Sequence, residues 1–119
     1  MPRQIRTKRV YDPPGRNDGK RVLVDRLWPR GLKKDVAAID LWLRDVAPSS
    51  ELRRWFGHDA KRWAEFRRRY AAELDRNRAA LKPLFEATGI VTLLFAARDP
   101  GKNNAVALAD WLKAHNSAS

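Results

Sequence analysis

The segment VLVDRLWPRG, residues 22–31, places polar and aromatic side chains directly after a short apolar run. Asp25, Arg26, Trp28 and Arg30 follow that run closely. An arginine donates two hydrogen bonds in one plane, which suits a phosphate or a carboxylate. An indole beside it can stack on a base or sugar, or simply cover a pocket. The pattern favours an anion site, and a turn closed by salt bridges is the structural alternative.

A second group of polar residues follows the apolar segment IVTLLFAA, residues 90–97. Arg98 and Asp99 come directly after it, and Asn103 and Asn104 lie where the last helix should begin. Free backbone N–H groups at a helix N-terminus favour an anion. If the strands are parallel neighbours, their C-terminal ends meet at one edge, which is where open α/β sheets bind ligands. The predicted ligand-binding residues are therefore Arg26, Trp28, Arg30, Arg98, Asn103, Asn104 and Tyr11.

Structural roles are the alternative for several of these residues. Asp25 can pair with Arg26 or Arg98 and merely close the strand ends. Trp28, which precedes a proline, can anchor the following loop by packing. The same motif is therefore consistent with a binding site and with a packed turn.

The candidates for catalysis are Asp25, Asp99 and His58. A carboxylate pair can act as acid and base, and an imidazole titrates near neutral pH. His58 lies in a Gly-His-Asp sequence, where a histidine is often a surface or capping residue. One of Asn103 and Asn104 is expected to be an N-cap in any case. The catalytic residues are thus not decided by the sequence.

Three strands are expected, over residues 5–11, 21–25 and 90–97. The last is apolar at nearly every position, which is typical of a central strand covered on both faces. Residues 12–20, DPPGRNDGK, have the composition of a loop. Short helices are expected within residues 35–56, with Ser49 or Ser50 as an N-cap for the last of them.

Longer helices are expected later in the chain. Asp59 is a good N-cap, and Trp63, Phe66, Tyr70 and Leu74 follow at helical spacing. Strands separated by helices indicate an α/β fold with a small, mostly parallel sheet of about three strands, flanked by helices in a Rossmann-like layered architecture. The domain should span residues 1–119, with 1–4 and 115–119 frayed.

The chain carries a formal net charge of +11, with a sequence pI near 10.9. Residues 1–34 hold eleven Lys and Arg against three Asp, which leaves +8 in the N-terminal third. Such a field attracts nucleic acid, phosphorylated metabolites and acidic proteins alike. Functional nucleic-acid binding is therefore an alternative hypothesis, and the run Arg67–Arg69 is either a solvated helix face or part of such a surface.

Composition also narrows the chemistry. The sequence has no cysteine and only two histidines, far apart, so no metal site and no thiol nucleophile is expected. No phosphate-binding glycine loop or other cofactor motif is present, so no cofactor is expected. No apolar run is long enough to span a bilayer, and the N-terminus lacks a secretory signal. A cytoplasmic protein without membrane contact is expected, and the oligomeric state is left open.

Three separated motifs, VDRLWPRG, DLWLRDVAPSSELRRWFGHD and LLFAARDPGKNNAVAL, give this chain a family resemblance. Together they resemble the YeaO-like branch of domain-of-unknown-function family 488, from about Val10 to Leu112. The resemblance implies a small, cytoplasmic, bacterial α/β protein and implies no settled activity. A longer branch of that family carries cysteines that this chain lacks. The characteristic positions carry over as Asp25, Arg26, Trp28, Pro29, Arg30, Gly31, Trp42, Pro48, Trp55, Phe56, His58, Arg98, Asp99, Asn103 and Asn104.

The leading hypothesis is a pocket at the C-terminal ends of the strands that holds a small anionic ligand, phosphorylated or nucleotide-like. Whether the pocket is catalytic is left open. The first alternative is a nucleic-acid-binding module that uses the basic N-terminal third. The second is a protein-interaction domain, which exposed tryptophans would favour.

Overall fold

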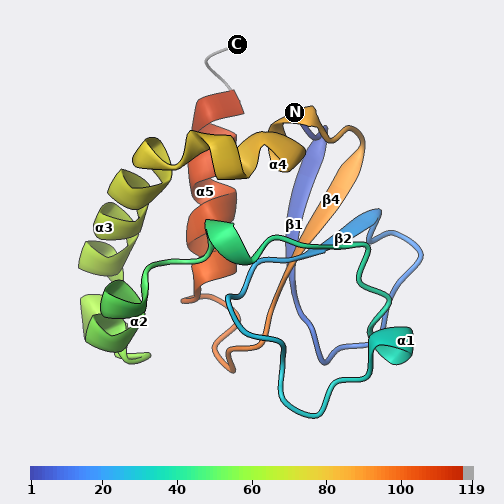
Figure 1. Ribbon diagram of the computed structural model, residues 1–119, viewed down its shortest axis with the longest axis horizontal. Helices are drawn as coiled ribbons and strands as arrows, with labels where there is room; N and C mark the ends of the chain where they lie inside the picture. Colours follow the sequence, from blue (N-terminus) through green and yellow to red (C-terminus); the bar gives the residue numbers. More distant parts are fainter. Residues whose placement is uncertain (117–119) are drawn as a thin grey trace.

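The computed structural model describes residues 1–116 and contains a four-stranded, wholly parallel sheet. Its strands are β1 (Gln4–Arg9), β2 (Lys20–Leu23), β3 (Leu41–Trp42) and β4 (Ile90–Phe95), in the order β1-β4-β2-β3. The predicted α/β fold is confirmed. The strand with the most apolar sequence, β4, lies between β1 and β2, as its pattern indicated (Figure 1).

The short strand β3 was not anticipated, because residues 35–56 are expected to hold only short helices. Two residues are too few to show an alternating pattern. The helical elements are α1 (Lys34–Ala37), η1 (Arg44–Val46), α2 (Ser50–Phe56), η2 (Ala60–Arg62), α3 (Trp63–Arg76), η3 (Arg78–Leu81), α4 (Lys82–Glu86) and α5 (Asn104–Asn116).

The helix starts follow the capping residues of the sequence. The hydroxyl of Ser49 accepts a hydrogen bond from the Leu52 amide at the start of α2. Asp59 caps the short η2 turn, which leads directly into α3. Side-chain acceptors at these positions satisfy amide groups that lack partners in the first helical turn.

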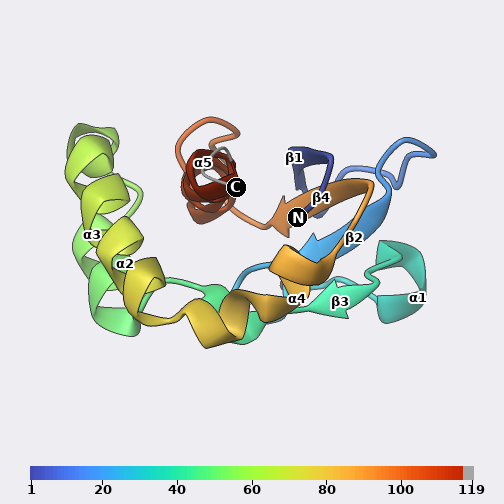
Figure 2. The ribbon, with the colours of Figure 1, turned by 90° about the horizontal axis from the view of Figure 1, so that it is seen from above.

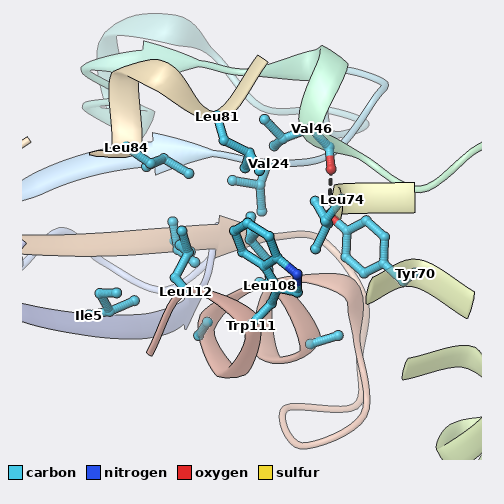
Figure 3. Packing of buried hydrophobic residues seen from close by; sticks show 14 of the residues in the cluster. Ile5, Val24, Val46, Tyr70, Leu74, Leu81, Leu84, Leu108, Trp111 and Leu112 are labelled. Atoms are coloured by element: carbon cyan, nitrogen blue, oxygen red, sulfur yellow. Dashed lines mark hydrogen bonds between the residues drawn. The ribbon is translucent and has the colours of Figure 1, made fainter. Parts of the chain in front are cut away.

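The larger core covers one face of the sheet. Side chains of β2, of β4 and of the residue after β2 pack on this face against η3, α4 and α5. Figure 3 shows Val24, just after β2, among Leu81, Leu84, Leu108 and Leu112. The Tyr70 hydroxyl donates a hydrogen bond to the Val46 carbonyl and joins α3 to η1. Figure 2 shows α3 and α5 on the same side of the sheet, with α1 on the other side.

The opposite face of the sheet is covered mainly by loops. A smaller apolar cluster of Val10, Leu23 and Leu94 packs there against partly buried side chains that include Trp28 and Trp42. The loop that joins β1 to β2 has to pass over β4, because β4 lies between those two strands. Such a parallel crossover is usually made by a helix. Here it is a polar loop, and it needs specific anchors.

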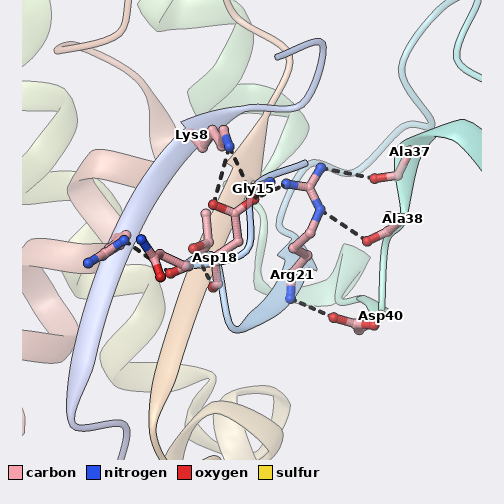
Figure 4. Close-up of polar contacts among 10 residues, drawn as sticks. Lys8, Gly15, Asp18, Arg21, Ala37, Ala38 and Asp40 are labelled. Carbon is pink, nitrogen blue, oxygen red and sulfur yellow. Dashed lines mark hydrogen bonds and ion pairs between the residues drawn. The ribbon is translucent and has the colours of Figure 1, made fainter. Parts of the chain in front are cut away.

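Asp18 and Arg21 provide these anchors, as Figure 4 shows. The Asp18 carboxylate lies 2.6 Å from Arg21 Nη1 and 3.1 Å from Lys8 Nζ, so it joins β1 to β2. Thr92 of β4 donates a hydrogen bond of 2.6 Å to the Asp18 carbonyl. The one polar residue of the central strand therefore holds the crossover loop in place.

Arg21 is only 4% exposed and is nevertheless well satisfied. Besides Asp18, its guanidinium donates to the carbonyl oxygens of Ala38 and Ala37, at 3.0 and 2.9 Å. Its backbone amide donates to the carboxylate of Asp40 at 2.8 Å. One buried arginine thus ties the crossover loop to α1 and to the residue that precedes β3 (Figure 4).

The N-terminal residues, expected to be frayed, are held in the structure. The Met1 ammonium group donates a hydrogen bond of 2.6 Å to the Phe85 carbonyl, and the Arg3 amide donates to Gly89 at 2.7 Å. At the other end α5 runs to Asn116, and the rest of the tail expected to fray lies outside the described residues. Within residues 1–116, no helix has both the length and the apolar character that crossing a membrane requires.

The Asp18 contacts lead to a test of stability. We expect Asp18→Asn to lower the free energy of unfolding at pH 7 by about 3 kcal/mol, because it leaves buried Arg21 without its counter-charge. Urea denaturation measures this loss. The control is Asp12→Asn, an exposed residue of the same loop, which should change stability by less than about 0.5 kcal/mol. Equal effects of the two substitutions would contradict the anchoring role.

The same pair predicts a pH dependence. Burial acts to raise the pKa of Asp18, but hydrogen bonds from Gly15, Lys8 and Arg21 outweigh it, and the pKa lies below its ordinary value of 3.8. The unfolded chain therefore binds this proton more tightly. The stability difference between wild type and Asp18→Asn should be complete above pH 3.8 and shrink as the pH falls through the folded pKa. Urea titrations at stepped pH measure it, and a difference that grows on acidification would contradict the assignment.

Candidate functional site

A pocket of about 590 Å³ opens at the C-terminal ends of the strands. Residues that follow β1, β2 and β4 all line it, together with α2 and the start of α5. Its lining includes eight of the residues singled out in the sequence: Tyr11, Asp25, Arg26, Trp28, Arg30, His58, Asn103 and Asn104. Arg98 and Asp99 are exposed and are not among the described residues that line the pocket. The parallel sheet thus brings most of the predicted set to one place.

Asp25 joins three elements at this edge. Its carboxylate accepts a hydrogen bond of 2.9 Å from the Ala96 amide, just beyond β4, and one of 3.1 Å from the Asn104 side chain of α5. Its backbone carbonyl accepts a hydrogen bond of 2.7 Å from the indole of Trp42, at the end of β3. The residue that follows β2 therefore holds the ends of the neighbouring strands and the start of α5.

The environment of Asp25 raises its pKa above the ordinary value of 3.8. Burial is the main cause, because it disfavours the ionised carboxylate. The hydrogen bonds from Ala96 and Asn104, and the charges of Arg53 and His58, oppose the shift without cancelling it. The ion pair with Arg26 or Arg98, which was the structural alternative, does not form among the described residues. Both carboxylate oxygens are instead occupied by N–H groups of the fold.

The two asparagines have structural partners. Asn103 accepts a hydrogen bond from the Val106 amide at 3.0 Å and is the N-cap of α5, as one of the pair was expected to be. Asn104 donates to the Val24 carbonyl and to Asp25, both at 3.1 Å. Asp99 accepts from the amides of Gly101 and Lys102 and so shapes its own turn. These contacts are local architecture rather than open ligand positions.

The segment after Asp25 forms one wall of the pocket. The indole nitrogen of Trp28 donates to the Leu32 carbonyl at 2.7 Å, and its ring packs edge-on against Trp42 at 5.5 Å. The Tyr11 hydroxyl donates to the Arg30 carbonyl at 2.9 Å. Trp28 is therefore both a packing anchor and a pocket residue, and Tyr11 supports the backbone of the segment that carries the arginines.

Arg53 of α2 is a pocket residue that the sequence analysis missed. Its Nη2 atom donates to the Ser50 hydroxyl at 3.0 Å, while its Nε atom is buried and has no hydrogen-bond partner within the described chain. The Nε atom of Arg26 is also buried and has no hydrogen-bond partner within the described chain. Arg26 borders a second, smaller cavity of about 300 Å³ as well, which Glu73 also lines. The available signal was the spacing of Arg53 three residues before Phe56, on one face of a helix.

His58 lies at the pocket in an unusual backbone conformation. Its φ is +58°, in the left-handed region, where only glycine is free of steric cost. It follows Gly57, which has φ of +52° and ends α2. Two successive left-handed residues turn the chain sharply after α2 and leave the exposed histidine beside Phe56, with ring centres 6.2 Å apart. Strained residues of this kind are often found at functional sites.

Comparison with known proteins identifies the family. A model described as "Inactive DUF488-N3 subclade" matches residues 4–119. The chain belongs to this family. YeaO of Escherichia coli strain K12 is 45% identical over 111 residues, which cover 92% of this chain and 96% of YeaO. The resemblance to YeaO-like proteins is therefore confirmed.

The similarity extends to mycobacteria. Mb3100c of Mycobacterium bovis and Rv3073c of Mycobacterium tuberculosis are each 44% identical over 111 residues, covering 92% of this chain and 93% of the relative. These relatives, like YeaO, carry names that describe them as uncharacterized proteins. No solved structure matches the chain.

The conformation of His58 predicts a reversal of the usual order of glycine and alanine. We expect His58→Gly to be more stable than His58→Ala by about 1 kcal/mol, because alanine in the left-handed region has a steric cost that glycine avoids. The control is Ala72, an exposed residue within α3, where glycine should be less stable than alanine by about 1 kcal/mol. Urea unfolding of the three variants and wild type tests this, and equal stability of the two His58 variants would refute it.

Proposed function

We propose that the pocket is a binding site for a small anion, phosphorylated or nucleotide-like, and that it does not catalyse a reaction. The observation that carries the proposal is the convergence of three arginines, Arg26, Arg30 and Arg53, on one pocket. A guanidinium group donates paired hydrogen bonds to the oxygens of a phosphate or a carboxylate.

The charge of the lining supports an anion. Arg26, Arg30 and Arg53 all line the pocket, and Asp25 is the one carboxylate among its described lining residues. Both oxygens of Asp25 already accept hydrogen bonds from Ala96 and Asn104. The cationic side chains of the lining therefore outnumber its one anionic group.

Four observations favour binding over catalysis. The description of the matching family model calls the subclade inactive. Asp25, which the sequence suggested as a base, has its oxygens engaged by the fold. Asp99 is also engaged, in its own turn, and is outside the pocket lining. The sequence contains no cysteine that could act as a nucleophile.

The alternatives lose some of their support in this structure. In the basic N-terminal third, Lys8 and Arg21 pair with Asp18, and Arg9 donates to the Ala97 carbonyl. Fewer of these basic side chains are therefore free to contact nucleic acid than the sequence indicates. For a protein-interaction domain, exposed tryptophans were the expected sign, and all five tryptophans are buried or half-buried.

A thermal-shift comparison tests the anion site. Wild type, Arg53→Ala and Arg98→Ala are heated with inorganic phosphate, sugar phosphates, nucleotides, and short DNA and RNA. We expect at least one small phosphate compound to stabilise wild type, since a ligand at about 100 times its Kd adds roughly 2.7 kcal/mol. Arg53→Ala should lower the affinity for that ligand by roughly 10- to 100-fold, as expected for the loss of a charged hydrogen bond.

Arg98→Ala is the matched control, because it removes the same charge near the pocket from an exposed position that does not line it. It should leave the shift nearly unchanged. Shifts from DNA or RNA alone, equal in all three proteins and abolished by salt, would overturn the proposal in favour of nucleic-acid binding. A small-anion shift that Arg98→Ala removes and Arg53→Ala preserves would also contradict this assignment.

A further inference from the structure

The pocket has an apolar part that a bare anion cannot use. Phe56 and Phe66 line it and are 6% and 2% exposed, with ring centres 4.3 Å apart in a stacked arrangement. Ala47 and Pro48, both buried, lie in the same lining. A phosphate or a hydrated sugar placed against these groups would lose water without gaining hydrogen bonds. This part of the pocket suits a flat, apolar group.

Arginines and aromatic rings occur together on two walls of the pocket. On α2, Arg53 and Phe56 are three positions apart, which places them on one helix face. On the segment after β2, Trp28 lies between Arg26 and Arg30, and its hydrogen bond to Leu32 and its contact with Trp42 hold the ring. Each wall therefore offers a cation beside a positioned aromatic ring.

The volume of the pocket agrees with a ligand that has both an anionic and an apolar part. Its volume of about 590 Å³ lies within the range of roughly 300–1,000 Å³ that is usual for organic ligands. An inorganic ion would leave most of that space, including the phenylalanine side, unfilled. A ligand that uses the whole lining has both an anionic group and an apolar body.

We propose that the ligand is a monophosphate carried on an aromatic ring system, as in an aryl phosphate or a nucleoside monophosphate. The phosphate contacts Arg53 and Arg26, and the ring lies between Trp28 and Phe56. This inference rests on the proposed anion site and names its ligand class. It predicts that the ring, and not only the charge, contributes to affinity.

Calorimetric titration of the full chain tests this with four probes: phenyl phosphate, uridine monophosphate, glycerol 3-phosphate and inorganic phosphate, at one ionic strength. We expect at least one of the two ring-bearing probes to bind about tenfold or more tightly than glycerol 3-phosphate, a difference of about 1.4 kcal/mol. Trp28→Leu should remove most of that advantage, so that in this variant the ring-bearing probe binds about as tightly as glycerol 3-phosphate, while Trp28→Phe should retain the preference for a ring.

Trp55→Leu is the control, since Trp55 is a half-buried tryptophan of α2 that does not line this pocket. It should keep the preference for a ring. Should Trp28→Leu fail to fold, Phe56→Leu in the same titration answers the question, because it replaces a ring with an aliphatic group of similar burial. A preference that Trp55→Leu removes, or that both pocket variants retain, would overturn the inference.

The two proposals fail in different ways. Equal affinity for phenyl phosphate, uridine monophosphate and glycerol 3-phosphate, lost in Arg53→Ala, would overturn the ring-bearing ligand and leave the anion site standing. No heat and no thermal shift with any of the four probes would count against both. Binding of the ring-bearing probes that is unaffected by Arg53→Ala would overturn the assigned anion contact.

Discussion

Asp25 is the residue on which the geometry of this fold most depends. It follows β2, and its carboxylate holds the backbone beyond β4 and the first residue of α5, while its carbonyl holds Trp42 of β3. A half-buried carboxylate that accepts only N–H groups is costly to desolvate and directional in its contacts. The arginines and Trp28 follow along the chain, so Asp25 fixes where the pocket wall begins, and the contacts of Trp28 and Tyr11 hold the rest of it.

The two faces of the sheet are covered by different kinds of contact. On one face, helices cover β2 and β4 with aliphatic side chains, and the contact is apolar and tolerant of small shifts. On the other, a polar loop crosses β4 and is held by Asp18, Arg21 and Thr92. Such a buried ion pair contributes little net stability, but removing one partner is severe. The loop face therefore determines which way the crossover runs, and the helix face supplies most of the stabilisation.

The sequence predicted the parts of this structure that depend on residues close together in the chain. The apolar run of β4 indicated a central parallel strand, and Ser49 and Asp59 marked helix starts, because capping and burial act over a few residues. Contacts between residues far apart in the chain left weaker signals in the sequence. Arg53 resembled any other exposed helix arginine, and only the folded chain places it beside the residues after β2. Arg98 lies three positions beyond the end of β4, yet the turn shaped by Asp99 leaves it outside the pocket lining.

The strand order has a consequence for how the chain assembles. The first two strands never touch each other, since β4, near residue 90, fills the space between them. During synthesis on a ribosome, the first three-quarters of the polypeptide therefore has no complete sheet to form. The central strand arrives last and pairs with two segments that lie more than sixty residues upstream. Folding is slow in such a case, because the chain loses the entropy of closing these long loops before the strand pairs can stabilise it. The pairings at the centre of the sheet are thus withheld until β4 has left the ribosome, and a product truncated before β4 keeps at most the short pairing of β2 with β3.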